Sequence, residues 1–182
     1  MKDTIVVYQS KYGSTRKYAQ WLETLIDCDC VSVDDLKKKE LPYYDNIIFG
    51  GGIHAGGITG INLIKKNYKK IHDKNIIIFA VGIDDRKDET IKELKYINYN
   101  KKMEKIPLFF CPGAYDPFKI KGFDKWLITK VRNMIMRKPV VQREDSEVEL
   151  VKRIDNGGDW TDKKFLEPII KALDEGKIKK QI

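Results

Sequence analysis

The sequence has no apolar run long enough to span a membrane and no Walker-type nucleotide motif. Its longest apolar stretches, such as NIIIFAVGI at residues 75–83, are far shorter than the roughly 20 residues that cross a bilayer. The N-terminus lacks the apolar core of a signal peptide. No G-x-x-x-x-G-K-[ST] occurs, which disfavours a Walker-type nucleoside triphosphatase. We therefore expect a cytoplasmic protein.

Cysteine is scarce, and its spacing does not favour a metal centre. The three cysteines, Cys28, Cys30 and Cys111, form no C-x-x-C pair. A C-x-C pattern on a strand places both side chains on one face, as packing residues require. We predict no metal site.

Acidic residues are too few to balance the basic ones, which leaves a formal net charge of +8. Such a surplus favours an anionic partner, namely a membrane surface, an acidic small molecule or a nucleic acid. The basic segment Lys119–Lys138 contains seven Lys or Arg and one Asp, so it alone has a net charge of +6. The position of this segment in the fold should therefore help to decide among these three partners.

The basic segment also predicts an amphipathic helix. Its apolar residues are expected to form one stripe, made of Phe123, Trp126, Leu127, Val131, Met134 and Ile135. Such a helix either covers the sheet or lies on an anionic membrane with its aromatic residues in the interface. Apolar residues interleaved with the basic ones suit those surfaces better than stacking on bases, so nucleic-acid binding is disfavoured.

Strand and helix patterns alternate along most of the chain. Continuously apolar strands are typical of a parallel sheet covered on both faces, so we predict an α/β fold with a doubly wound sheet. Strands are expected at 4–8, 28–33, 46–50, 75–81 and 107–111, and helices at 15–26, 34–41, 61–71, 88–99, 123–137 and 162–173.

The chain is expected to form a single domain over residues 1–182, interrupted by one insertion. The insertion spans about 113–158 and follows the fifth strand. It contains the basic helix and, between Lys138 and Trp160, a short strand pair with a Gly-Gly turn.

Loops rich in glycine and small residues follow the first, third, fourth and fifth predicted strands. In an open α/β sheet, ligands bind beyond the carboxyl ends of the strands, where the strand order reverses. The four loops are therefore expected to converge on one site. Their sequences are QSKYGST, GGGIHAGGITG, GIDDRKD and PGAYDPF.

The first of these loops opens a helix. Unpaired N–H groups and the helix dipole favour a phosphate there, and Ser10, Ser14 and Thr15 add hydroxyl groups. Gly13 allows close backbone approach, while Lys11 and Arg16 add positive charge. The alternative is an ordinary helix cap formed by Ser14 or Thr15.

The stretch SKYGST resembles the flavodoxin phosphate loop T-x-T-G-x-T, with Ser10 and Tyr12–Thr15 at the matching positions. The GGGIHAGG loop, residues 50–57, follows the strand after which flavodoxin-like proteins hold one side of the flavin ring. The resemblance implies a flavodoxin-like sheet of five parallel strands in the order 2-1-3-4-5, with FMN as the cofactor.

Several longer stretches are similar to the flavodoxin-like, menaquinone-dependent protoporphyrinogen dehydrogenases. They are GGGIHAG, the segment PGAYDPFKIKGFDKWLITKVRNMIMRKP and the W-T-D at residues 160–162. This similarity implies an FMN oxidoreductase linked to a quinone or another small-molecule acceptor, with peripheral membrane contact through Lys119–Lys138. The alternative is an FMN electron carrier that serves a redox protein partner.

Under this resemblance the FMN phosphate lies in Ser10–Thr15, and the ring lies between the later loops. The chemistry takes place at flavin N5, so no side chain is named as catalytic. The expected cofactor residues are Ser10, Lys11, Tyr12, Gly13, Ser14, Thr15, Gly52, Ile53, His54, Ala55, Gly56, Val81, Gly82, Ile83, Asp84, Gly113, Ala114 and Tyr115.

Two features depart from electron-carrier flavodoxins. Asp84 and Asp85 stand where a flavin-facing aromatic is expected, so the ring is expected either to stack on Tyr115 or His54 or to be only partly stacked. The protein has a positive net charge, whereas electron-carrier flavodoxins are acidic. A positive field makes flavin reduction easier, which favours the function of a reductase.

Several other interpretations remain open. Gly50, Gly52 and Ala55 satisfy a dinucleotide pattern, G-x-G-x-x-A, although they follow the third strand. A receiver domain requires acidic residues after the first strand, where QSKYGST stands instead. His54 either transfers protons and contacts the flavin or is an ordinary loop histidine. The segment Asp84–Arg86 either binds substrate or caps the next helix.

Overall fold

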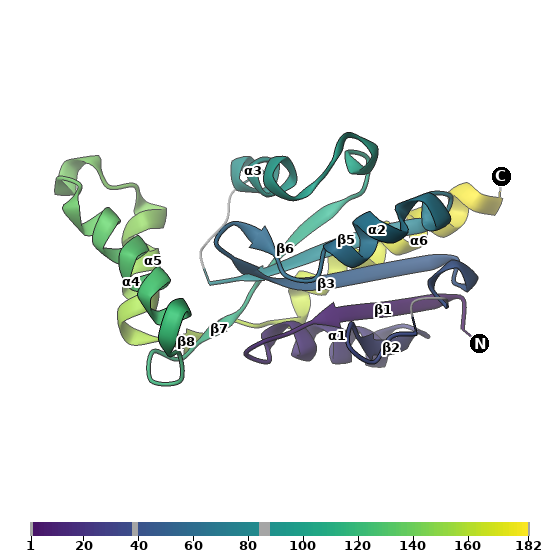
Figure 1. Ribbon diagram of the computed structural model, residues 1–182, viewed down its shortest axis with the longest axis horizontal. Coiled ribbons are helices and arrows are strands. Elements are labelled where there is room, and N and C mark those ends of the chain that lie inside the picture. The colour runs from purple at the N-terminus through teal and green to yellow at the C-terminus, as the bar shows by residue number, and fades with distance from the viewer. Residues whose placement is uncertain (1, 38–39, 84–87, 182) are drawn as a thin grey trace.

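The computed structural model describes residues 2–37, 40–83 and 88–181. Its centre is a sheet of parallel strands in the order β2-β1-β3-β5-β6 (Figure 1). This is the predicted flavodoxin-like order, because the extra strand β4 pairs only with β3 at one end of the sheet. The strands are β1 (Thr4–Gln9), β2 (Asp29–Ser32), β3 (Asn46–His54), β4 (Gly57–Ile58), β5 (Asn75–Gly82) and β6 (Leu108–Pro112).

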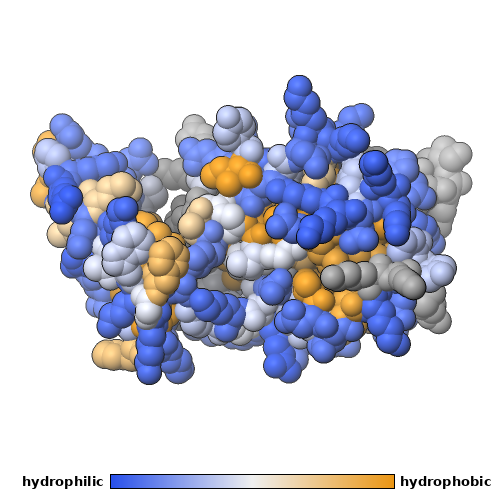
Figure 2. Space-filling view, viewed as in Figure 1, coloured by the Kyte–Doolittle hydropathy of each residue, from blue (hydrophilic) through white to orange (hydrophobic). Residues whose placement is uncertain are grey.

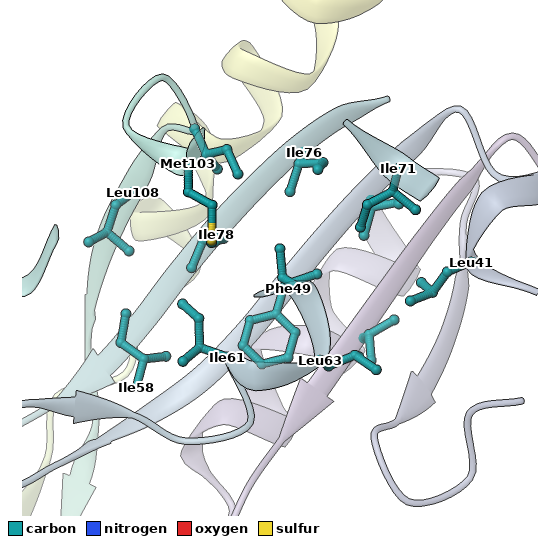
Figure 3. Close-up of a cluster of buried hydrophobic side chains, with 14 of the residues drawn as sticks. Leu41, Phe49, Ile58, Ile61, Leu63, Ile71, Ile76, Ile78, Met103 and Leu108 are labelled. Carbon is teal, nitrogen blue, oxygen red and sulfur yellow. The ribbon is translucent and has the colours of Figure 1, made fainter. Parts of the chain in front are cut away.

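Helices cover both faces of the sheet, as the apolar strands predict. On one face, α2 (Asn62–Ile71) and α3 (Asp88–Asn98) pack over a core that has Phe49 near its middle (Figures 1 and 3). On the other face, α1 (Ser14–Leu25) and α6 (Glu167–Gln181) cover a second core around Phe79 and Tyr18. Alternate residues of each strand enter opposite cores, and this fixes the register of the sheet.

The cysteines are packing residues of the second core. Cys28 and Cys111 are buried, while Cys30 is half-buried and packs against the same cluster as Cys28. Burial raises the pKa of the Cys28 thiol to about 11 and that of Cys30 to about 12. Both thiols therefore hold their protons at neutral pH.

A helical hairpin projects beyond the carboxyl ends of the strands (Figure 1, green, at the left). It consists of α4 (Gly122–Arg137) and α5 (Asp145–Asn156), and it joins the sheet through the antiparallel pair β7 (Ala114–Tyr115) and β8 (Gly158–Asp159). The two helices are linked by Arg132, whose Nε and Nη2 lie 2.5 and 2.9 Å from the two carboxylate oxygens of Asp155. A bidentate pair of this kind fixes orientation as well as distance.

The base of the hairpin is tied to α1. Lys17 donates hydrogen bonds to Asp159 at 2.9 Å and to Thr161 at 2.7 Å. Hydrogen bonds from Thr161 and Lys17 lower the pKa of Asp159 to about 2. The hairpin is therefore anchored both to the last strand of the sheet and to the helix that follows the first one.

Two sequence-based expectations were wrong, and a third was right except in its first turn. In place of the strand pair between Lys138 and Trp160, the structure has α5, which a capping box of Glu144 and Glu147 begins. The described part of the predicted helix 34–41 forms a turn, followed by the 3-10 helix η1 (Leu41–Tyr43). The helix expected at 162–173 starts as the 3-10 helix η4 (Lys163–Leu166), because Pro168 is tolerated only in the first turn of α6.

Candidate functional site

A cavity of about 300 Å³ lies where the predicted loops converge, between the carboxyl ends of the strands and the helical hairpin. Every predicted cofactor residue lines it except two. Gly13 forms the turn of the same loop, and Asp84 lies outside the described residues. The lining residues that the sequence did not predict are Thr59, Ile120, Asp124, Leu127, Ile128, Val131, Leu150 and Ile154.

The phosphate loop, Ser10–Thr15, has the geometry of an anion site. Gly13 has a φ of 101°, a left-handed conformation that favours glycine, and its N–H donates to Ser10 Oγ at 3.1 Å. Gly13 is the N-cap of α1, and no side chain caps this helix, so neither Ser14 nor Thr15 acts as the cap. The first N–H groups of α1 have no partners within the helix and face the same end of the sheet as the cavity.

Ser14 connects the phosphate loop to the loop after β6. Its Oγ accepts a hydrogen bond from the N–H of Ala114 at 2.9 Å. The N–H of Gly113 in turn donates to the carbonyl of Gly82 at 2.6 Å, which joins the ends of β5 and β6. Three of the four predicted loops are therefore held together by direct hydrogen bonds.

The three consecutive glycines of β3 differ in what surrounds them. A Cβ on Gly50 would lie 2.1 Å from the ring of Phe79, and one on Gly51 would lie 2.4 Å from the carbonyl oxygen of Thr59. A Cβ on Gly52 would have 3.7 Å or more to its nearest neighbours, Thr59 and Thr15. Gly50 and Gly51 thus serve packing, while Gly52 leaves space between β3 and the phosphate loop.

The same segment contradicts the dinucleotide interpretation. A G-x-G-x-x-A fingerprint requires a helix that opens directly at its glycines. Here β3 continues as a strand to His54 and turns back into β4, and α2 begins only at Asn62.

A tight turn at Ala55 and Gly56 connects β3 to β4 at the edge of the cavity. His54 pairs with Gly57 across this hairpin, and Ala55 and Gly56 have φ values of 50° and 77°. Positive φ at both central residues is the requirement of a type I′ turn. Ala55 is the only non-glycine residue with positive φ in the described chain.

Replacing Ala55 with glycine should stabilise the protein by about 0.5–1 kcal/mol, because the left-handed conformation is costly for an L-residue with a side chain. Urea unfolding of the variant and the wild type measures this difference. Ala19→Gly in the middle of α1 is the matched control, and it should lower stability instead. A destabilised Ala55→Gly variant would contradict the strain assigned to this turn.

Asp124, in the first turn of α4, joins the helical hairpin to two of the site loops. Its Oδ2 lies 2.6 Å from Lys11 Nζ and also accepts a hydrogen bond from the hydroxyl of Tyr12. Its Oδ1 lies 2.8 Å from Nε2 of His54. His54 is therefore neither a backbone-bound nor a purely solvated loop residue.

The electrostatics of this Asp124 cluster, made of Lys11, Tyr12, His54 and Asp124, follow from its hydrogen bonds. Those from Lys11, Tyr12 and His54, in that order, hold the pKa of Asp124 well below its usual range. The carboxylate in turn raises the pKa of Lys11 and that of Tyr12. At neutral pH the cluster contains an ionised carboxylate, a charged lysine and a protonated phenol.

Asp124 was missed because its partners are far away in the sequence: 112 residues separate it from Tyr12. One local signal was present. Asp124 is the only acidic residue in the basic segment Lys119–Lys138. An isolated carboxylate among seven basic residues indicates a specific partner.

The helical hairpin forms the apolar end of the cavity. This end is lined by Leu127, Ile128 and Val131 of α4 and by Leu150 and Ile154 of α5. Nearby, Arg153 of α5 donates to the carbonyl of Ile83 at 3.0 Å, which fixes α5 against the end of β5. We call this end of the cavity the apolar chamber.

The predicted single stripe of α4 is in fact two. Leu127 and Val131 line the chamber and Ile135 is buried, whereas Phe123, Trp126 and Met134 are exposed. Figure 2 shows apolar residues at the surface of the hairpin, at the left of the view. The prediction failed because it assumed one neighbour for α4. Of the exposed residues, Phe123 lies beside His54, with 6.0 Å between the ring centres, and stacks on Trp126.

The segment Asp84–Arg86, for which the sequence left open a role in capping or substrate binding, lies outside the described residues. Within the described ranges, no cluster of three metal-ligating side chains occurs. No helix described here has the length and apolar character needed to cross a membrane.

Comparisons with known proteins agree with this architecture. A family model described as a flavodoxin domain matches residues 5–141. No curated protein matches the chain. Among solved structures, a WrbA-like flavodoxin protein from Agrobacterium tumefaciens is 16% identical with a TM-score of 0.43, and the match covers 84% of this chain and 92% of that one.

Two further solved structures are similar at the same level. The Trp repressor binding protein from Bacillus subtilis is 14% identical with a TM-score of 0.43, covering 62% of this chain and 88% of that one. A flavodoxin from Megasphaera elsdenii is 14% identical with a TM-score of 0.39, covering 59% and 84%. Because the family model spans most of the sheet, the phosphate loop and α4, the chain belongs to the flavodoxin domain family.

Proposed function

We propose that this protein is an FMN-dependent oxidoreductase that passes electrons to a small apolar acceptor of the quinone class. The observation that carries the proposal is the two-ended cavity. One end is a phosphate loop at a helix N-terminus, and the other is the apolar chamber of the helical hairpin. A site with both ends suits a phosphorylated cofactor next to an apolar substrate.

The residues present fit FMN. The phosphate would bind the N–H groups at the start of α1 and the hydroxyls of Ser10, Ser14 and Thr15. The ring would lie among Gly52–Gly56, Val81–Ile83 and Gly113–Tyr115, all of which line the cavity. When bound, FMN supplies one- or two-electron transfer through N5, and the protein supplies position and electrostatics.

The finer assignment, activity of the protoporphyrinogen dehydrogenase type, rests on the sequence similarity and is part of this proposal. The positive surface near α4 suits a substrate with carboxylates, while the chamber suits an apolar ring system. Anaerobic incubation of the FMN-loaded protein with protoporphyrinogen and menadione tests it. Porphyrin fluorescence should appear faster than with free FMN at equal concentration, and equal rates would reject this substrate.

The alternative is an electron carrier between protein partners. A carrier needs an open cofactor edge, whereas here α4 and α5 wall the cavity on one side. Reoxidation of the dithionite-reduced protein by menadione separates the two functions. Rapid reoxidation favours the oxidoreductase, while a stable semiquinone with slow reoxidation favours the carrier.

Ser14→Glu should weaken FMN binding by about a hundredfold or more, because it brings a negative charge and extra volume to the phosphate loop. The visible spectrum and flavin fluorescence during FMN titration measure the affinity. Thr24→Glu adds the same charge at the other end of α1 and should leave the affinity within about twofold, since that site is remote and screened. Failure of the wild type to bind FMN would reject the proposed function.

We further propose peripheral contact with the cytoplasmic face of an anionic membrane. The outer stripe of the hairpin, Phe123, Trp126 and Met134, is exposed and continues to Val140 and Val141 at its tip. Lys121, Lys125 and Lys130 lie along the same helix, and Lys130 Nζ is 5.1 Å from the centre of the Trp126 ring. Aromatic and cationic residues together suit the interface of an anionic bilayer.

A further inference from the structure

His54 stands out among the polar groups of the cavity. It lies at the end of β3, lines the cavity, and its Nε2 is 2.8 Å from a carboxylate oxygen of Asp124. Its side chain is 37% exposed, whereas that of Asp124 is only 10% exposed. The imidazole is therefore held at Nε2 by a largely buried carboxylate, while the His54 side chain itself is partly open to solvent.

We propose that His54 donates a proton to the acceptor during its reduction, and that Asp124 is the residue that positions the imidazole. The inference rests on the proposed function, since it concerns the same acceptor. An imidazole whose Nε2–H is donated to a carboxylate has its orientation and tautomer fixed, and its Nδ1 is left for the substrate.

Reduction of a quinone requires a proton donor of this kind. Conversion of a quinone to a quinol consumes two electrons and two protons. When bound, reduced FMN would supply both electrons and one proton as a hydride to one quinone oxygen, and would itself be oxidised. The second proton passes from Nδ1 of protonated His54 to the other oxygen, where the quinol O–H bond forms as the N–H bond breaks. The neutral imidazole then regains a proton from solvent.

Other titratable groups that line the cavity are poorly suited to this step. The hydrogen bond to Asp124 raises the pKa of Tyr12, and burial raises the pKa of Tyr115, so both phenols hold their protons. Lys11 is also held in its charged form by the Asp124 carboxylate. Asp124 is ionised and has no proton to give. Lys11 and Tyr12 of the phosphate loop are connected to His54 through Asp124 of α4.

The positioning role is tested without any cofactor or turnover. In ¹⁵N spectra of the labelled protein at high pH, neutral His54 should be fixed as the Nε2–H tautomer, and Asp124→Asn should remove that preference. His72, the second of the two histidines, provides the internal reference. The Asp145→Asn variant removes an exposed carboxylate from the first turn of α5 in the same hairpin and should leave the His54 signals unchanged. Identical His54 tautomers in Asp124→Asn and the wild type would overturn the positioning role.

The catalytic role is tested by reoxidation of the dithionite-reduced, FMN-loaded protein with menadione at several pH values. His54→Gln should lower the rate by about a hundredfold at pH 6 and remove its decline with rising pH, since general acids contribute about that factor or more. Asp124→Asn should lower the rate as well, but by less than His54→Gln, because the imidazole is still present and only its positioning is lost. Asp145→Asn, the control on the same hairpin, should match the wild type.

The outcomes separate this inference from the proposed function. If the wild type binds FMN but reacts no faster than free FMN, the quinone acceptor is wrong, while the tautomer experiment still decides the role of Asp124. If the wild type reacts rapidly and His54→Gln is within threefold of it, His54 is not the donor. A slower His54→Gln variant with an unchanged pH profile would likewise overturn the inference, because a purely structural loss leaves the pH dependence intact.

Discussion

Replacing Gly50 with alanine should lower the free energy of unfolding by about 3 kcal/mol, near the upper end of the usual cost of overpacking. Gly50 lies in β3, which pairs with strands on both sides, so the backbone cannot move aside cheaply. The added methyl group would lie 2.1 Å from Cζ of Phe79, a ring that is itself fully buried. Urea unfolding followed by circular dichroism measures the loss.

Two further variants test the cause of this effect. Gly52→Ala is the matched control, because its methyl group would have 3.7 Å or more to its neighbours and should change stability by less than about 1 kcal/mol. In the Phe79→Leu background, Gly50→Ala should cost less than in the wild type, since the clashing atoms are gone. A Gly50→Ala protein as stable as Gly52→Ala would show that the close approach is not what requires glycine here.

The contrast among Gly50, Gly51 and Gly52 shows where sequence analysis reached its limit. The sequence places all three in one loop that faces a ligand, because glycine allows both close packing and close approach of a ligand. Only the tertiary neighbours, Phe79 for the first and Thr59 for the second, assign two of them to packing. A run of identical residues contains no signal that separates these roles.

The sheet was predictable for a different reason. Apolar strands such as residues 75–82 are covered on both faces, so their composition alone indicates a parallel sheet. The phosphate loop was predictable because its function depends on local backbone geometry at a helix start, which Gly13 and the neighbouring hydroxyl residues encode. In both cases the information is contained within a few consecutive residues.

The helical hairpin was predicted less well because its environment is not local. The sequence analysis placed a strand pair between Lys138 and Trp160, yet Leu150, Val151 and Ile154 have helical spacing and Glu144 with Glu147 caps the helix. The neighbour of α5 is α4, and the Arg132–Asp155 ion pair joins the two helices. Likewise, the apolar chamber exists only because both helices contribute to it.

If the outer stripe of α4 contacts a membrane, replacing both Phe123 and Trp126 with serine should weaken vesicle binding by about thirtyfold. Fully burying an aromatic side chain is worth about 1.5–3 kcal/mol. Phe123 and Trp126 are 63% and 55% exposed, so each has roughly half of its surface, or about 1 kcal/mol, to contribute. Cosedimentation with vesicles of equal parts phosphatidylcholine and phosphatidylglycerol measures the partition coefficient.

The control variant loses two exposed apolar side chains on another helix, α3. Tyr96 and Ile97 of α3 are 90% and 58% exposed, and replacing both with serine should leave vesicle binding within about twofold if the contact is confined to α4. Vesicles of phosphatidylcholine alone should bind less of the wild type, and added salt should weaken binding to the anionic vesicles, because the basic segment supplies part of the attraction. Equal losses from the α3 and α4 variants would mean that general surface hydrophobicity drives the binding. No loss from the α4 variant would remove the outer stripe as a membrane contact and leave its aromatic residues without an assigned partner.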